Sequence, residues 1–455
     1  MHDQPWSPQS WASMPAAQMP PYEDEAAVRS TIERLRSMPP LVTSWEIERL
    51  RGQLAQAQAG ERFVLQGGDC AERLSECTPQ AITTKLKILM QMSLVLVHGA
   101  QKPVVRLGRF AGQYAKPRSS ATETRAGSDG GERTLPAYFG DLVNRAAFDE
   151  DSRRPDPARM IVGYQHAAMT LNFIRSLVEG GFADLHHPEY WDLAFMDQAG
   201  LSADVRRDYQ EASRQLAGAL RFMEALGETS IDQLTRVEFF TSHEGLNLHY
   251  ESAQTRRVPR REGFYTLTTH MPWIGERTRA LGGAHVEFFR GVRNPVGVKL
   301  GPASDPAGVV ALARVLNPDN EPGRLALILR LGADRVDGAL PPIVERVEGE
   351  GLRVLWMCDP MHGNTMKTAG GIKTRRFEAI LAELERSFDA HARLGTNLGG
   401  VHFELTGEDV TECTGGATGV TEADLGRNYT SLCDPRLNYQ QSMELAFRIA
   451  RRMRS

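Results

Sequence analysis

The chain has 455 residues, of which 53 are lysine or arginine and 57 are aspartate or glutamate. Its formal charge of −4 gives no basic excess of the kind that binds nucleic acid or an anionic membrane. The sequence lacks both a membrane-spanning apolar run and a signal-like N-terminus, and its five cysteines have no zinc-finger spacing, so we expect a cytoplasmic protein in a reducing compartment.

Residues 1–60 are predicted to form an N-terminal extension. Residues 1–40 are rich in Pro, Met, Ser and Gln, which favours an extended arm with one short helix over residues 25–37. Thr43 and Glu46 have the spacing of a capping box, in which each residue satisfies a backbone N–H of the other. This pattern predicts a second helix that runs from there to about residue 57.

Eight short apolar runs predict the strands of one sheet. They lie at residues 63–69, 104–108, 237–242, 265–270, 296–300, 325–330, 353–358 and 400–404. Helical patterns separate most of them, at residues 83–97, 274–290, 306–316, 341–348 and 374–394. From His243 to His362, the polar residues that end successive runs recur roughly every 30 positions, the length of one strand-plus-helix unit. We therefore predict an α/β fold, a (β/α)8 TIM barrel over residues 61–455, with catalytic groups at the C-terminal strand ends.

One interval does not fit this period. The 134 positions between Arg109 and His243 are far more than one unit needs. Residues 120–230 contain a polar, glycine-rich stretch and two amphipathic patterns, at residues 167–178 and 205–223, each with one apolar face. We predict a loop and an extra helical insertion after the second strand, which serves packing or subunit contact.

Four strand-end or loop residues are candidate metal ligands: Cys70, His362, Glu404 and Asp434. A thiolate, an imidazole and two carboxylates suit a borderline divalent transition metal better than magnesium or calcium. Taken singly, each residue is as readily structural, since a lone cysteine after a strand usually belongs to the core. Their joint placement at one end of a barrel favours a metal site.

A basic loop follows the second predicted strand. It carries Arg109, Lys116 and Arg118, with Gly112 and Pro117 between them. Glycine lets the backbone approach a ligand and proline stiffens the turn, so three cations on this loop suggest an anion site. A solvated basic loop is the alternative.

Three further cations are predicted at the same end of the barrel. Lys299 and Arg330 lie in or directly after apolar runs, where a solvated position is a poor explanation. Arg277 is as readily a surface residue. Buried cations are costly unless anions pair with them. Six cations therefore predict substrates with several anionic groups, such as two phosphates and a carboxylate.

Six motifs in this sequence resemble those of the type II 3-deoxy-D-arabino-heptulosonate 7-phosphate synthases. They are FVLQGGDCAE at 63–72, AGQYAKPRS at 111–119, WIGERTR at 273–279, NPVGVKLG at 294–301, CDPMHGN at 358–364 and TGEDVTEC at 406–413. They occur in the family's order, and the resemblance runs from about residue 39 to the C-terminus. The polar stretch 120–133 is longer than the family's usual linker.

The resemblance implies a fold, a reaction and a cofactor. The family condenses phosphoenolpyruvate with erythrose 4-phosphate, the first committed step toward chorismate and the aromatic amino acids. It does so on a (β/α)8 barrel with an N-terminal extension and extra helices. A divalent metal assists, for which we expect Mn²⁺ or Co²⁺ first, with Zn²⁺ or Fe²⁺ as alternatives.

The same resemblance assigns residues to roles. The metal ligands are Cys70, His362, Glu404 and Asp434. The substrate-binding residues are Arg109, Lys116, Arg118, Ser119, Glu276, Arg277, Lys299 and Arg330, with Lys116, Arg118 and Ser119 on the erythrose 4-phosphate side. The candidate catalytic residues are Lys116, His270, Lys299 and His362, with Lys116 and His270 considered for proton transfer.

The sequence also suggests how the protein assembles and which other functions are open. We expect a homo-oligomer, either a dimer or a tetramer, and a chorismate mutase is a candidate partner protein. No nucleic acid or membrane is expected to bind. Two other functions stay open: a metal-dependent barrel aldolase that uses pyruvate, and a catalytically silent barrel that binds a partner through its helical insertion.

Overall fold

The computed structural model describes residues 5–126, 131–180, 207, 211, 214, 238–416 and 418–454. The amphipathic pattern predicted over residues 205–223 therefore lies almost wholly outside the described residues. None of the described helices combines the length and the apolarity that crossing a membrane requires.

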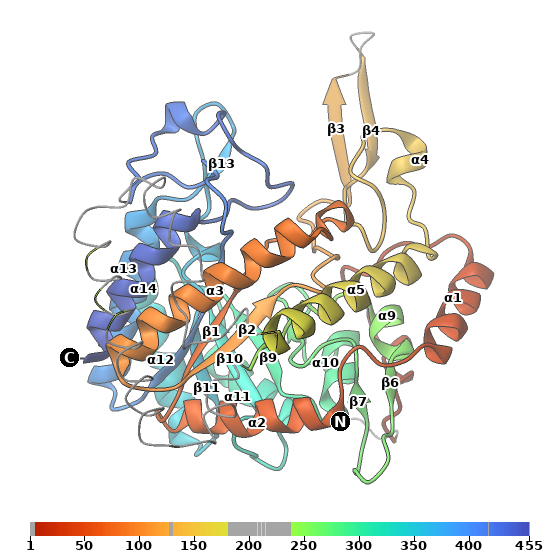
Figure 1. Ribbon diagram of the computed structural model, residues 1–455. Coiled ribbons are helices and arrows are strands. Elements are labelled where there is room, and N and C mark those ends of the chain that lie inside the picture. Colours follow the sequence, from red (N-terminus) through yellow and green to blue (C-terminus); the bar gives the residue numbers. More distant parts are fainter. Residues whose placement is uncertain are drawn as a thin grey trace.

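One curled sheet of eight parallel strands forms the centre of the molecule (Figure 1). In spatial order its strands are β5 (Phe240–Thr241), β2 (Val104–Arg109), β1 (Phe63–Gly68), β14 (Leu398–Glu404), β11 (Leu355–Cys358), β10 (Leu325–Leu329), β9 (Val296–Leu300) and β8 (Trp273–Ile274). The two edge strands approach each other, because Glu244, just after β5, forms a parallel bridge with Trp273 of β8. The predicted α/β fold is confirmed, and the curled sheet is consistent with a TIM-like barrel.

Helices surround this sheet (Figure 1). They are α3 (Pro79–Ala100), α5 (Arg159–Glu179), α10 (Ala284–Arg290), α11 (Pro306–Leu316), α12 (Val336–Gly349), α13 (Phe377–Arg393) and α14 (Tyr439–Arg454). The last helix of the chain packs tightly on the first barrel helix, since a Cβ atom on Gly99 of α3 would lie 2.2 Å from the Cβ of Ala450 in α14. Only glycine allows the two backbones to come so near.

The helix α2 (Ser44–Gln58) covers the N-terminal end of the barrel. Its predicted capping box between Thr43 and Glu46 is confirmed. The buried residues Leu50, Leu54 and Ala57 pack with the apolar side chains that fill the barrel interior. Because this end is covered, polar groups in the barrel can meet ligands only at the opposite end, where the strands finish.

Smaller elements lie around the barrel. They are η1 (Ser10–Ser13), α1 (Glu25–Ser37), η2 (Leu74–Glu76), α4 (Glu150–Arg153), α9 (Leu248–Ala253), η4 (His362–Asn364), η5 (Glu422–Asp424) and the two-stranded pairs β3 (Thr122–Ala126) with β4 (Glu132–Pro136), β6 (Thr255–Arg256) with β7 (Tyr265–Thr266), and β12 (Met366–Lys367) with β13 (Lys373–Thr374). The β3–β4 hairpin, which the sequence reading treated as a loop, projects from the body of the molecule (Figure 1).

The fourth predicted strand was misplaced. Residues 265–266 form β7, which pairs antiparallel with β6, and the barrel strand β8 begins only at Trp273. The helix predicted over residues 274–290 begins at Ala284 instead. The intervening residues, with Gly275, Gly282 and Gly283, form a loop at the end of β8. The α14 helix and the β6–β7 and β12–β13 pairs were not predicted.

Candidate active site and metal centre

A pocket opens at the C-terminal ends of the strands. All eight predicted substrate-binding residues line it: Arg109, Lys116, Arg118, Ser119, Glu276, Arg277, Lys299 and Arg330. They come from the ends of four different strands and from the loop that follows β2. The structure therefore brings this whole set together, while the role of each residue stays a prediction.

The four predicted metal ligands also meet beside this pocket. Ligand atoms of Cys70, Glu404 and Asp434 all lie within 4.8 Å of one another. The Nε2 atom of His362 lies 3.0 Å from Oε1 of Glu404. Cys70 follows β1, Glu404 ends β14, His362 follows β11 and Asp434 belongs to the loop before α14. Four separate chain segments thus converge on one point.

This cluster suits a cation. The Nζ atom of Lys116 lies 2.8 Å from Sγ of Cys70, 3.3 Å from Oε1 of Glu404 and 3.1 Å from Oδ2 of Asp434. An ammonium group therefore already binds three of the four candidate ligands. Burial and the nearby Cys433 and Glu404 raise the pKa of the Cys70 thiol, Lys116 opposes this shift, and a bound metal ion would oppose it further.

Glu404 is the centre of the charge network. Its Oε2 lies 2.8 Å from Nη2 of Arg375, and its Oε1 lies 3.1 Å from Nη2 of Arg109. Burial alone would raise the pKa of this carboxyl, but His362, Lys116 and the two arginines outweigh it and hold the pKa well below its usual range. Glu404 is thus a carboxylate, as a metal ligand must be.

Asp359 orients the predicted ligand His362. Its Oδ2 lies 2.7 Å from Nδ1 of His362, which leaves Nε2 of the imidazole directed to Glu404. Asp359 also lies 2.5 Å from Nζ of Lys299. Burial lowers the pKa of Lys299 to about 8, although Asp359 opposes this effect. Asp359 belongs to the CDPMHGN motif at 358–364, but no role was predicted for it; its position directly after a strand was the available signal.

Arg109 is held by two residues that the sequence reading did not assign. Its Nη1 donates to Nε2 of His402 over 2.7 Å, and its guanidinium lies 5.2 Å from the centroid of a Trp273 ring. Burial and the charges of Lys299 and Arg109 hold the pKa of His402 well below its usual range, so the imidazole is neutral and can accept this bond. The position of His402 within the last strand was the only signal in the sequence.

Two further pocket residues were not assigned. Glu244 lines the pocket, and burial raises the pKa of its carboxyl. Its Oε1 atom is buried without a hydrogen-bond partner among the residues that the structure describes. Lys373 of β13 also lines the pocket, with Nζ 3.2 Å from Oδ1 of Asp434.

His270 does not lie in the pocket, contrary to expectation. Its Nδ1 accepts from the backbone N–H of Thr241 over 2.9 Å, and its Nε2 lies 3.8 Å from Glu46 at the start of α2. The expectation placed His270 at the end of the fourth strand. Because β8 begins three residues later, His270 precedes this strand and faces the covered end of the barrel. A direct role of His270 in proton transfer is therefore withdrawn.

Comparisons with known sequences agree with this geometry. The profile of the Class-II DAHP synthetase family matches residues 6–450. The chain is 46% identical over 461 residues to a phospho-2-dehydro-3-deoxyheptonate aldolase of Neurospora crassa, covering 98% of this chain and 94% of the relative. It is 47% identical over 441 residues to a protein of the same name from Streptomyces coelicolor, covering 97% of this chain and 96% of the relative.

Proposed function

Because the chain belongs to the Class-II DAHP synthetase family, we infer that its two substrates react in the pocket at the C-terminal ends of the strands. Its activity is that of a DAHP synthase, or phospho-2-dehydro-3-deoxyheptonate aldolase, which catalyses the first step of the shikimate pathway. This activity implies phosphoenolpyruvate and erythrose 4-phosphate as substrates. The observation that carries the site assignment is the convergence of six cations with a four-residue ligand cluster.

The pocket wall offers separate places for the two anionic substrates. We assign phosphoenolpyruvate to the side formed by Arg109, Arg277, Lys299 and Arg330, and erythrose 4-phosphate to the side formed by Lys116, Arg118 and Ser119. Glu276 supports the first side, because its Oε1 lies 2.8 Å from Nη2 of Arg279 and its Oε2 accepts from the backbone N–H of Gly301. Cations on both sides offset the repulsion between two phosphorylated molecules and hold them in contact.

The reaction needs a carbon–carbon bond and a released phosphate. Carbon 3 of phosphoenolpyruvate attacks the aldehyde carbon of erythrose 4-phosphate, and positive charge develops at carbon 2. Water adds there, and the resulting hemiketal phosphate loses inorganic phosphate by C–O cleavage. We assign to Nζ of Lys116 the proton that the former aldehyde oxygen gains, because this ammonium group lies between the ligand cluster and the Arg118 side of the pocket.

The ligand cluster fits a divalent metal ion. We propose that Cys70, His362, Glu404 and Asp434 hold it, with Mn²⁺ or Co²⁺ preferred and Zn²⁺ or Fe²⁺ as alternatives. A bound ion supplies Lewis-acid polarisation of the aldehyde oxygen. The residues around it keep its ligands charged and oriented: Asp359 turns His362, and Arg375 and Arg109 keep Glu404 ionised.

A direct test measures phosphate release from the purified protein. With phosphoenolpyruvate, erythrose 4-phosphate and metal together, release should accompany formation of the seven-carbon product. Replacing phosphoenolpyruvate by pyruvate should give no product, which separates the synthase from a pyruvate aldolase. Arg118→Met should raise the KM for erythrose 4-phosphate while that for phosphoenolpyruvate changes little. The reverse pattern would exchange the two sides of the pocket.

We also propose a homo-oligomer. Val162 and Met169 lie seven positions apart on α5, so they share one face, and their side chains are 36% and 53% exposed. A second copy that packs on this face would bury them. Sedimentation of a strictly monomeric species at micromolar concentration would contradict the proposal. A chorismate mutase stays a candidate partner, for which co-sedimentation of the two proteins is the test.

A further inference from the structure

Two candidate metal ligands come from opposite ends of the chain. Cys70 and Asp434 are separated by 364 positions in the sequence, yet the backbone N–H of Asp434 donates to Sγ of Cys70 over 3.2 Å. Cys70 follows the first strand, whereas Asp434 lies in an irregular loop after the last one. Since a metal site tolerates little variation in ligand spacing, a further contact has to fix these two segments relative to each other.

Arg436 makes that contact. Its Nη1 donates to Oδ1 of Asp69, the residue before Cys70, over 2.7 Å. Its Nε and Nη2 donate to the two carboxylate oxygens of Glu412 over 3.1 and 2.9 Å. Arg436 is only 6% exposed, and both acidic partners are fully buried. One guanidinium group therefore joins the segment of Cys70 to the loop of Asp434.

Glu412 shapes the loop that carries Asp434. Its carboxylate accepts from the backbone N–H groups of Thr430, Ser431 and Arg436 over 3.1, 2.8 and 2.7 Å. Residues on both sides of Asp434 are thus bound to a single side chain. These three contacts help to fix the path of the loop, together with the bond from Nη1 of Arg375 to the carbonyl of Pro435 and the bond from Oγ of Ser431 to the carbonyl of Asp434.

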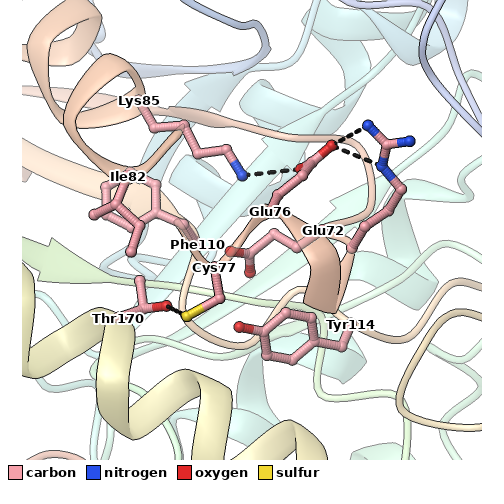
Figure 2. Close-up of a pocket in the computed structure, with 9 residues that line it drawn as sticks. Glu72, Glu76, Cys77, Ile82, Lys85, Phe110, Tyr114 and Thr170 are labelled. Atoms are coloured by element: carbon pink, nitrogen blue, oxygen red, sulfur yellow. Dashed lines mark hydrogen bonds and ion pairs between the residues drawn. The ribbon is translucent and has the colours of Figure 1, made fainter. Parts of the chain in front are cut away.

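Lys85 holds Asp69 from the other side. Its Nζ lies 2.5 Å from Oδ2 of Asp69. The same Nζ lies 3.1 Å from Oε2 of Glu76 (Figure 2). Lys85 belongs to α3, the helix against which α14 packs. Asp69 is therefore a charged junction between the first barrel helix and the C-terminal loop.

We propose that Arg436 is a positioning residue that sets the spacing of Cys70 and Asp434 and thereby the metal affinity of the centre. This inference rests on the proposed metal centre. Arg436 is not among the residues that line the substrate pocket, so a substrate-binding role does not explain it. Stability alone is a weak reason for a buried ion pair, because apolar residues of similar volume often stabilise a fold as well or better.

The test measures how tightly the apo-forms of wild type and of the variants bind metal ions in the absence of substrates. Arg436→Lys keeps the positive charge but cannot bridge Asp69 and Glu412 with a planar fork. We expect its Kd for Mn²⁺ and Co²⁺ in calorimetric titrations to rise about 10- to 100-fold, as is typical when a residue that orients metal ligands is changed. The near-ultraviolet thiolate-to-Co²⁺ absorption band, which reports binding through Cys70, should appear only at correspondingly higher Co²⁺ concentration.

Arg324→Lys is the matched control. Arg324 is another buried arginine, 5% exposed, whose Nη2 donates to the carbonyl of Phe289 over 3.0 Å, away from the ligand cluster. Its replacement should lower the unfolding temperature and leave the metal Kd unchanged. Equal weakening of metal binding in both variants would overturn the positioning role, because the effect would then be a general loss of stability.

A milder variant covers the case in which Arg436→Lys does not fold. Thr430→Val removes the bond from Nη2 of Arg436 to Oγ1 of Thr430, 2.7 Å long, and keeps both ion pairs. We expect a several-fold weaker metal Kd at an unchanged unfolding temperature. Unaltered metal affinity in a folded Arg436→Lys or Thr430→Val protein would overturn the inference. If the wild-type apo-protein itself bound neither ion, the proposed metal centre would fail instead.

Discussion

The Nζ atom of Lys116 lies 2.8 Å from the Sγ atom of Cys70. Burial alone would lower the pKa of this lysine, but Cys70, Glu404 and Asp434 outweigh it and raise the pKa well above its usual range. In the proposed metal centre, a charged ammonium group and a metal ion would therefore compete for the same three side chains. Metal binding and the position of Lys116 are coupled, and the following predictions begin from this relationship.

Chelation should abolish activity, and Mn²⁺ or Co²⁺ should restore it. The variant Lys116→Met should bind metal at least as tightly as wild type, because it loses a competitor and no ligand, although its turnover should fall. Cys70→Ser should bind metal more weakly. Metal content by atomic absorption and phosphate release measure the two effects separately. Full activity in a demonstrably metal-free sample would refute metal dependence.

Arg330→Lys should separate substrate binding from metal binding. Nη2 of Arg330 donates to the carbonyl of His362 over 3.0 Å, and its Nε is buried with no hydrogen-bond partner among the described residues. A charge-assisted bond to a phosphate is worth roughly 1.5–3 kcal/mol, so kcat/KM for phosphoenolpyruvate should fall about ten- to a hundredfold. Metal content should stay normal.

His362→Ala provides the contrast to Arg330→Lys. It should lose metal occupancy, and raising the substrate concentration should not recover its activity. Near-wild-type phosphoenolpyruvate kinetics in Arg330→Lys would mean that Arg330 is a structural cation, and the assignment of this substrate to β9 and β10 would then be withdrawn.

Glu383 should make stability depend on pH. Burial raises the pKa of this carboxyl to about 7 from an ordinary value of 4.5. Its two oxygens accept from the backbone N–H of Leu331 and from Nδ2 of Asn364, each over 2.7 Å. Between pH 4.5 and 7 the folded protein binds this proton more strongly than the unfolded chain does. Stability from this group is therefore present at low pH and is lost as pH rises through this window.

Glu383→Gln should remove this contribution. An altered hydrogen bond lowers the free energy of unfolding of the variant by the same amount at every pH. As pH rises from 4.5 to 7, the free energy of unfolding of the variant should increase by up to roughly 3 kcal/mol relative to that of wild type. Thermal or urea unfolding of both proteins across this range measures the difference. A stability difference that stays constant with pH would show that Glu383 does not titrate in this window.

Oxidation of the apo-enzyme should join Cys70 to Cys433. A hydrogen bond with Cys70 lowers the pKa of Cys433, so a larger fraction of this thiol is ionised than of an ordinary cysteine. With metal bound, Cys70 is engaged, and the bridge should form slowly. Peptide mapping after diamide treatment should find the bridged pair without metal and little of it with metal. Cys433→Ser should give no bridged peptide; Cys70 that stays unpaired in oxidised apo-protein would count against the prediction.

The sequence pattern predicted those parts of the fold that have long, regular periodicity. The bounds of α1 and α11 agree with the expected ranges, because their apolar residues recur at helical spacing and their caps are clear. The pattern failed at β8, which contributes only two residues to the sheet. A strand this short leaves no alternation to detect, and the apolar run before it was taken for the strand, which also displaced His270.

The sequence could predict which residues line the pocket where these residues lie at or just after a strand end, while their roles stay predictions. The buried residues that contact these side chains or hold their loops were not predicted: Asp359, His402, Glu412, Arg375 and Arg436. Each of these residues contacts a partner that is distant in the sequence or a partner that was itself predicted as a ligand. Arg436, for example, contacts Asp69, which lies 367 positions away. Local sequence has no signal for such contacts, because they exist only once the segments have met.

Because Cys70 and Asp434 lie far apart in the sequence, the two proposed ligands are synthesised at different times during translation. During synthesis the N-terminal part emerges first, with β1, the Cys70 thiol and α3 in place to fold. The loop of Asp434 and the helix α14, which packs on α3, are translated last. A nascent chain therefore presents an incomplete set of the proposed ligands until Asp434 has been synthesised. A chain that ends before residue 434 would carry three of the four proposed ligands and should therefore bind the ion more weakly.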